Sequence, residues 1–170
     1  MIIRSAVVND IKQIVEIGLE CRLGNWTESD YRNDVERSDS LILVAAIRET
    51  AIGFLSARLN GYNLSAPVSE FKEDLAGGED SGRACGFTES DIVNFGVLEK
   101  FRKSGIATAL LSEFKARAVL LNVKSVWLEV RQSNISAVNL YRKNGFLDVQ
   151  TRKNFYTNPS DNAIIMKLKL

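Results

Sequence analysis

The segment RKSGIATALL, residues 102–111, follows the strand-like run DIVNFGV at residues 91–97 and opens an apolar-striped helix. A glycine-containing turn between a strand and a helix suits a phosphate group, because the first helical N–H groups lack partners within the helix and the helix dipole favours negative charge. Arg102 and Lys103 add cationic donors at this turn. The fingerprints G-x-x-x-x-G-K-[ST] and G-x-G-x-x-G occur nowhere in the chain. The segment therefore predicts an anion site that belongs neither to a P-loop nor to a dinucleotide-binding fold.

Length and composition limit the number of domains, the chemistry and the location that the chain can have. The chain has 170 residues with 22 basic and 21 acidic side chains, so we expect a single domain over residues 1–170 with no overall field that would attract nucleic acid or a membrane. The absence of histidine excludes Ser-His-Asp, Cys-His and H-E-x-x-H chemistry. Cys21 and Cys85 are too few for a disulfide framework or a zinc site, and we expect both thiols to be buried or idle, with no bound metal. A charged residue at Arg4 and the lack of a long apolar run indicate a cytoplasmic protein without a signal peptide or membrane span.

Hydrophobic periodicity predicts a mixed α/β fold that begins with a strand over residues 2–8. A helix follows, for which Asn9 is the candidate N-cap. Thr27 with Asp30 three residues later predicts a capping box for a second helix. Trp26 can pack on Tyr31 as a hydrophobic staple, and the alternative is that both side chains also line the groove for the acceptor. The later predicted elements are strands at 41–47, 51–59 and 91–97, a helix ending near Leu121, a strand at 124–130, a helix capped by Ser133 or Asn134 and ended at Asn144-Gly145, and strands at 146–155 and 163–170.

A second motif, LEVRQSN at residues 128–134, is followed by Ala137, by Leu140-Tyr141 and by Gly145-Phe146. Together with R-x-x-G-x-A at residues 102–107, it resembles the acetyl-coenzyme A motifs of the Gcn5-related N-acetyltransferase (GNAT) superfamily. Within that superfamily the pattern is similar to the bacterial ribosomal-protein alanine N-acetyltransferases. The resemblance is strong over residues 91–170 and topological before them. It implies one domain with a twisted, mostly antiparallel sheet flanked by helices, in the order β-α-α-β-β-β-α-β-α-β-β.

The resemblance also implies acetyl-coenzyme A as co-substrate. Phe95, Gly96 and Val97 match the bulged strand whose backbone N–H groups contact the acetyl oxygen, in the manner of an oxyanion hole. The other positions that match cofactor contacts are Arg102, Lys103, Ser104, Gly105, Ile106, Ala107 and Thr108 in the pyrophosphate loop, and Asn134, which is equally suited to cap a helix.

Two side chains match the catalytic positions of the resembled group. Glu129 matches the general base, acting directly or through water, and Tyr141 the general acid that returns a proton to the thiolate. The alternatives are an exposed Glu129 carboxylate paired with Arg131, and a Tyr141 that only fills the core.

We therefore expect an N-acetyltransferase that transfers the acetyl group directly in a ternary complex, because no Cys or His nucleophile is placed for a covalent intermediate. The expected acceptor is a protein N-terminal α-amino group. Small amines, aminoacyl groups and lysine side chains stay open as acceptors, as does a non-catalytic acyl-coenzyme A sensor, and the oligomeric state is not predicted. Two departures from the resembled group bear on the acceptor: Phe155 stands where that group tends to carry Tyr, and residues 60–90 form an acidic insertion. That insertion is either a dispensable solvated loop, which we favour, or a lid that attracts a cationic amine.

Overall fold

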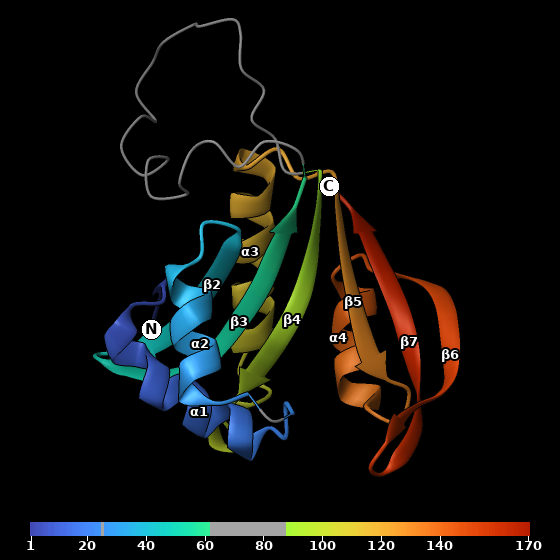
Figure 1. Ribbon diagram of the computed structural model, residues 1–170, viewed down its shortest axis with the longest axis horizontal. Helices are drawn as coiled ribbons and strands as arrows, with labels where there is room; N and C mark the ends of the chain where they lie inside the picture. Colours follow the sequence, from blue (N-terminus) through green and yellow to red (C-terminus); the bar gives the residue numbers. More distant parts are fainter. Residues whose placement is uncertain (25, 62–87) are drawn as a thin grey trace, which may run out of the picture.

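A computed structural model describes residues 1–24, 26–61 and 88–170 of the chain (Figure 1). The interior of the acidic insertion and Cys85 lie outside the described residues, so the alternatives for them stay open. In chain order the described elements are β1 (Ile2–Ser5), the 3-10 turn η1 (Val8–Asp10), α1 (Ile11–Glu20), α2 (Glu28–Glu36), β2 (Ser40–Ile47), β3 (Thr50–Asn60), β4 (Glu89–Val97), the 3-10 turn η3 (Glu99–Phe101), α3 (Ile106–Leu120), β5 (Ser125–Arg131), α4 (Ile135–Lys143), β6 (Leu147–Thr157) and β7 (Ser160–Lys169). Because β3 runs to Asn60 and β4 begins at Glu89, the insertion predicted over residues 60–90 is shorter at both ends.

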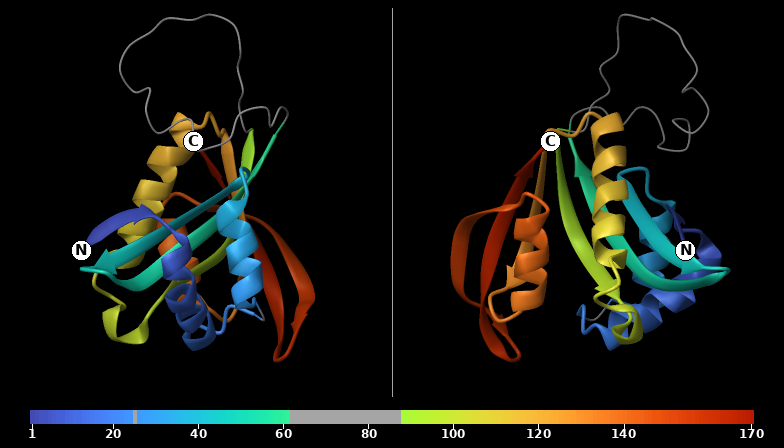
Figure 2. Two further views of the ribbon diagram at one scale, coloured as in Figure 1. Left: turned by 60° about the vertical axis from the view of Figure 1, so that its left-hand side comes forward. Right: turned by 180° about the vertical axis from the view of Figure 1, so that it is seen from behind.

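The described strands form one seven-stranded sheet in the order β1-β2-β3-β4-β5-β7-β6. Every neighbouring pair is antiparallel except β4 and β5, which run parallel. Helices α1 and α2 cover one face over the N-terminal strands, and α3 and α4 lie against the other face (Figures 1 and 2). The predicted element order and the mostly antiparallel sheet are confirmed. Among the described helices, none is long and apolar enough to cross a membrane.

The core consists of two apolar layers, one on each face of the sheet. Leu43 and Leu55 point into the layer under α3 and α4, whereas the adjacent Val44 and Phe54 point into the layer under α1 and α2. All four side chains are fully buried. Burial on both faces explains why β2 and β3 appear in the sequence as continuous apolar runs rather than as an alternation.

The predicted start of α2 is confirmed. The Asp30 N–H donates to Thr27 Oγ1 at 3.3 Å, and the Thr27 N–H donates to the Asp30 carboxylate at 2.7 Å, which completes the capping box. The Trp26 and Tyr31 ring centroids lie 5.0 Å apart, as the staple requires. These contacts fix the direction in which the chain enters α2.

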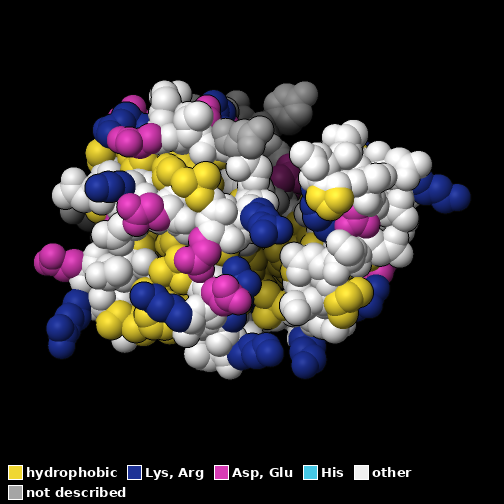
Figure 3. Space-filling view, turned by 90° about the horizontal axis from the view of Figure 1, so that it is seen from below, with side chains coloured by type: hydrophobic (Ala, Val, Ile, Leu, Met, Phe, Trp, Pro, Cys, Tyr) yellow, Lys and Arg dark blue, Asp and Glu magenta, His cyan; other side chains and the backbone are white. Residues whose placement is uncertain are grey.

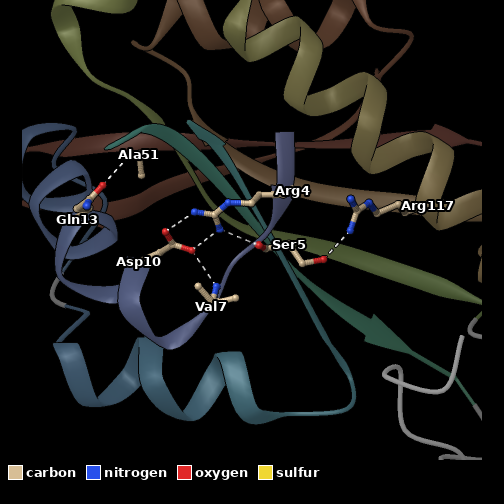
Figure 4. A network of polar contacts seen from close by, with 7 residues as sticks. All are labelled: Arg4, Ser5, Val7, Asp10, Gln13, Ala51 and Arg117. Carbon is tan, nitrogen blue, oxygen red and sulfur yellow. Dashed lines mark hydrogen bonds and ion pairs between the residues drawn. The ribbon is translucent and has the colours of Figure 1, made fainter. Parts of the chain in front are cut away.

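The prediction of Asn9 as the cap of the first helix is wrong, because Asn9 lies inside η1 and α1 begins after Asp10. The Asp10 carboxylate is buried and accepts two hydrogen bonds from the Arg4 guanidinium, at 2.6 and 2.8 Å, and one from the Val7 N–H at 2.8 Å (Figure 4). The acidic side chain thus holds the η1 turn by bonding backward to β1. Arg117 of α3 reaches β1 as well, donating to Ser5 Oγ at 2.6 Å.

The C-terminal half follows the predicted pattern closely. Asn134 caps α4, because its Oδ1 accepts the Ala137 N–H at 3.2 Å. Gly145 follows the helix with φ +95°, the left-handed conformation that glycine adopts without a steric penalty. In β5, Leu128 and Val130 are buried while Glu129 between them is exposed. This alternation sends Glu129 to the face that α4 does not cover.

Candidate active site

The two parallel strands separate before they end. Residues Glu89–Ile92 of β4 pair with Ser125–Leu128 of β5, and beyond that point the pairing stops although both strands continue. Figure 1 shows the strands diverging toward the lower end of the molecule. Each strand therefore has a free edge facing the gap.

A bulge precedes this free edge. Ser56 of β3 pairs with Asn94 while Ala57 pairs with Ile92, so Val93 is an extra residue in β4. The strand is bulged, but at Val93 rather than at Phe95–Val97, so the bulge lies just before the residues expected to contact the acetyl group.

The direction of the β4 amides beyond the bulge follows from the ladder. The Leu98 N–H donates to the Ile52 carbonyl at 3.0 Å. Because hydrogen-bonded and non-bonded pairs alternate in an antiparallel ladder, the N–H groups of Phe95 and Val97 point away from β3, toward the gap. They are the kind of free backbone donors that can stabilise a developing oxyanion.

A pocket of about 740 Å³ lies along the gap. Of the residues predicted to contact the cofactor, all except Ser104 line it, and so does Tyr141. Figure 3 looks into the molecule from below and shows a hollow between its two halves, with hydrophobic side chains inside and charged side chains of both signs at the rim. Arg102, Lys103 and the free backbone donors at the start of α3 line one part of this pocket, which suits a ligand with a neutral arm and an anionic end.

The turn before α3 presents several free backbone donors. Gly105 has φ +84° and is the N-cap of α3, and the first helical bond runs from the Ala109 N–H to the Gly105 carbonyl at 2.9 Å. Within the described chain, the N–H groups of residues 105–108 have no hydrogen-bond partner. The helix start is thus suited to an anion, as predicted.

Two side chains of this turn also bond to backbone carbonyls of the chain itself. The Arg102 guanidinium is directed at the end of β4, where Nε donates to the Val97 carbonyl at 3.0 Å and Nη2 lies 3.5 Å from Cys21 Sγ. The Ser104 hydroxyl donates to the Phe101 carbonyl. Arg102 thus ties the turn to β4, and both Arg102 and Lys103 line the pocket beside the free backbone donors.

Tyr141 lies on α4 at the inner wall of the pocket. Its ring centroid is 6.2 Å from that of Phe95 and 5.6 Å from that of Phe146, and only 7% of the residue is exposed. Burial, with a smaller contribution from the charge of Tyr156, raises the pKa of Tyr141 well above that of an ordinary phenol. Tyr141 is thus a core side chain that keeps its proton. Among described residues its hydroxyl has no hydrogen-bond partner, so the proton is available to the pocket that Tyr141 lines.

Glu129 is not part of the pocket wall and lies on the opposite face of β5 from Tyr141. The carboxylate accepts a hydrogen bond from Arg152 of β6 at 2.7 Å, so the alternative of a pair with Arg131 is wrong as to the partner. Arg131 instead stacks on Tyr156 at 4.0 Å. The two predicted catalytic side chains therefore flank the gap from opposite sides.

Several pocket residues escaped the sequence analysis. Cys21 was expected to be buried or idle, but it is partly exposed, lines the pocket with Leu23 and lies 3.4 Å from the Val97 carbonyl. No local signal indicates that the end of α1 would reach β4. Ala137 was noted as part of the second motif but not as a pocket residue, although it follows the capping Asn134 by three residues and lies on the same helix face. In the described part of the chain, no group of Cys, Asp and Glu side chains could hold a metal ion.

Comparison with known proteins gives consistent results. The sequence model of the acetyltransferase (GNAT) family matches residues 11–146. The N-alpha-acetyltransferase of Sulfurisphaera tokodaii is 29% identical over 162 residues, which cover 94% of this chain and 87% of the relative. The [ribosomal protein bS18]-alanine N-acetyltransferase of Haemophilus ducreyi is 39% identical over 89 residues, 48% of this chain and 59% of the relative. The crystal structure of Arabidopsis thaliana NAA60 in complex with acetyl-CoA has the same fold, with a TM-score of 0.78, 22% identity, and coverage of 99% of this chain and 98% of that one.

Proposed function

The chain belongs to the acetyltransferase (GNAT) family and is an acetyl-coenzyme A-dependent N-acetyltransferase, and we propose that its acceptor is the α-amino group of a protein N-terminus. The observation that carries this proposal is the divergence of β4 and β5, which opens one gap to a donor pocket on one side and to Glu129 on the other. The similarity to an N-alpha-acetyltransferase over 94% of the chain supports the choice of acceptor. A cytoplasmic location is a further part of the proposal.

On the donor side, the residues around the pocket bind acetyl-coenzyme A. The pyrophosphate of acetyl-coenzyme A binds the free N–H groups at the start of α3 with help from Lys103, and Asn134 contacts the coenzyme while capping α4. The N–H groups of Phe95 and Val97 bond the acetyl oxygen as it becomes an oxyanion. Gly96 between them leaves room for the wall formed by Cys21 and Leu23, and the other predicted loop residues shape the pocket around the cofactor.

On the acceptor side, Glu129 removes a proton from the ammonium, directly or through water, and the amine then attacks the thioester carbonyl. The carbon–sulfur bond breaks, Tyr141 gives its proton to the departing thiolate, and the phenolate takes the second proton from the nitrogen of the new amide. A partly exposed carboxylate is a weak base, so the ease of deprotonating the acceptor matters. An α-amino group has a reference pKa of about 8, against about 10.4 for a lysine side chain, which makes the N-terminus the easier acceptor by more than two units.

An acceptor panel with free thiol as readout tests the proposal. The panel contains three kinds of acceptor. The first is a peptide with a free N-terminus, the second is the same peptide with its N-terminus blocked and one internal lysine added, and the third is a set of small primary amines. We expect thiol release with the free N-terminus and little with the blocked peptide. Turnover restricted to the lysine peptide or to small amines would refute the acceptor, and binding of acetyl-coenzyme A without any turnover would indicate a sensor module.

The roles of the two side chains are tested separately. Glu129→Gln and Tyr141→Phe should each lower kcat by about 10²- to 10⁴-fold, the usual contribution of general acid–base catalysis, while both variants still melt at higher temperature with acetyl-coenzyme A. An unchanged kcat in either variant would remove that residue from the mechanism without affecting the assignment of the donor pocket.

A further inference from the structure

A second bulge shapes the face on which Glu129 lies. In the β6–β7 pair, Arg152 is opposite Ala163 and Tyr156 is opposite Asp161, so residues 153–155 stand against Asn162 alone. The Asn162 side chain accepts the Asn154 N–H at 2.9 Å and donates to Gln132 at 2.8 Å. Backbone and side-chain bonds thus hold the bulge in place, and with it the residues at its two ends.

The bulge brings Arg152 into contact with the proposed base. Arg152 Nη1 lies 2.7 Å from Glu129 Oε1, and the guanidinium lies 5.5 Å from the ring centroid of Phe155, which is itself 44% exposed. The Arg152 side chain is 49% exposed, and among the described residues this single bond is its only hydrogen bond. Most of the donors of the guanidinium therefore face solvent beside the acceptor side of the gap.

The surrounding face carries charges of both signs. Arg131 is on the same face of β5 as Glu129, and Lys167 of β7 lies 4.2 Å from the Trp127 ring next to it. The acids of the neighbouring strand already accept hydrogen bonds within the chain: Glu89 from Trp127 and Ser125, and Asp91 from Asn60. Figure 1 shows that α1 and α2 lie over the N-terminal strands, while α4 lies behind β5 and β7, so no described helix covers this face.

We propose that Arg152 selects acceptor polypeptides that carry Asp or Glu within their first two residues. The acceptor ammonium binds the second oxygen of Glu129, and the acidic side chain of the acceptor binds the exposed edge of the Arg152 guanidinium. Because Glu129 and Arg152 are in direct contact, the two groups that they bind must be neighbours, which limits the carboxylate to the first or second residue. A planar guanidinium fork matches a carboxylate in a bidentate manner. The inference rests on the proposed acceptor class and refines it.

The experiment uses peptides with Ser in position one and Glu, Gln or Lys in position two, identical otherwise, with kcat/KM measured from thiol release. The wild-type chain should prefer Glu over Gln by about tenfold. This is the effect expected of one charge-assisted hydrogen bond, reduced because the site is exposed to solvent. Arg152→Gln should remove this preference, and Arg152→Glu should favour Lys. Arg142→Gln is the matched control: Arg142 is an equally exposed arginine on α4, paired with Asp148, and its loss should leave the preference intact.

The readout is a ratio between peptides on one variant, so a partly unfolded sample does not change it. Equal kcat/KM for the three peptides on the wild-type chain would overturn the inference while the proposed function stands. A uniform loss across all peptides in Arg152→Gln would also overturn it, because Arg152 would then only position Glu129. Thiol release with small amines but with no peptide would overturn the proposed function and this inference together.

Discussion

Replacing Gly96 by Ala tests how closely the wall of the pocket fits against β4. A Cβ at this position would lie 3.0 Å from Cys21 Sγ, 3.0 Å from Leu23 Cδ1 and 3.2 Å from Ile17 Cγ2. Attractive contacts between carbon atoms lie at about 3.5–4.0 Å, so each of these neighbours must move by several tenths of an ångström. Because Cys21 and Leu23 line the pocket, their displacement changes its shape.

The expected cost follows from two opposing contributions. Overpacking of a close-packed site costs about 1–3 kcal/mol, and replacing glycine inside a strand returns about 0.5–1 kcal/mol. The net loss is then roughly 0–2.5 kcal/mol, which for a chain of this size lowers Tm by up to about 10 °C. A shift of the Val97 N–H weakens an oxyanion donor, whose complete loss costs about 10²–10³ in kcat. We expect a fall in kcat of at least about tenfold.

Thermal melting with and without acetyl-coenzyme A, together with steady-state kinetics, measures both effects. Gly18→Ala is the control, because its Cβ would crowd the Tyr31 hydroxyl at 3.1 Å within the same helical layer but outside the pocket wall. That variant should change Tm and leave the kinetics unchanged. A Gly96→Ala protein with the Tm and kcat of the wild type would show that the wall yields freely and that the reasoning is wrong.

Three further predictions concern stability. Burial alone would raise the pKa of Asp10, but the hydrogen bonds from Arg4 and Val7 outweigh burial and lower the pKa. The ionised carboxylate therefore stabilises the fold at neutral pH. That contribution disappears as the pH falls through the lowered pKa. Asp10→Asn should therefore cost more at pH 7 than at pH 3 in urea unfolding, with about 2–4 kcal/mol lost at pH 7. Burial raises the pKa of Asp34 despite the nearby Arg58, so its ionised form costs stability as the pH rises, and Asp34→Asn should show the reverse order, a larger loss at pH 3 than at pH 7. Asn134→Ala removes an N-cap and should cost about 1 kcal/mol in thermal unfolding, whereas Asn134→Ser, which keeps a capping oxygen, should cost less.

Local rules were sufficient wherever a structure depends on near neighbours in the sequence. The capping box at Thr27 and Asp30, the Asn134 cap and the stop at Gly145 each involve residues within a few positions, and all were predicted correctly. The alternation in β5, where Leu128 and Val130 are buried, likewise explains why Glu129 points away from the core.

The same rules failed where a distant partner decides the outcome. Asn9 has the right side chain for a cap, but Arg4 and Val7 hold Asp10 in a way that starts the helix one residue later. Glu129 pairs with Arg152 because of a bulge that shifts the β6 register by two residues, and no short motif in the sequence marks that bulge.

The geometry of the pocket was the feature hardest to predict from the sequence. Cys21 becomes part of the donor pocket only because α1 ends against the free edge of β4, some seventy-five residues later in the chain. Arg102 was expected to face the ligand, and the unpaired carbonyl of Val97, exposed by the same separation of strands, also attracts its guanidinium. Both differences arise from tertiary packing that a pattern of residue types does not encode.

The short seam between β4 and β5 has a consequence for the lifetime of the protein. In the described part of the sheet, the pairs from Glu89–Ser125 to Ile92–Leu128 and the bond from the Lys124 N–H to the Thr88 carbonyl join two ladders that are each held together by long antiparallel pairings. Such a joint is expected to open before either ladder unfolds, and amide protons near it should exchange with solvent first. A co-substrate that contacts both sides closes the joint, adding about 2.7 kcal/mol when it is present at a hundred times its Kd. The supply of acetyl-coenzyme A would then govern how long the chain survives proteolysis as well as how fast it works.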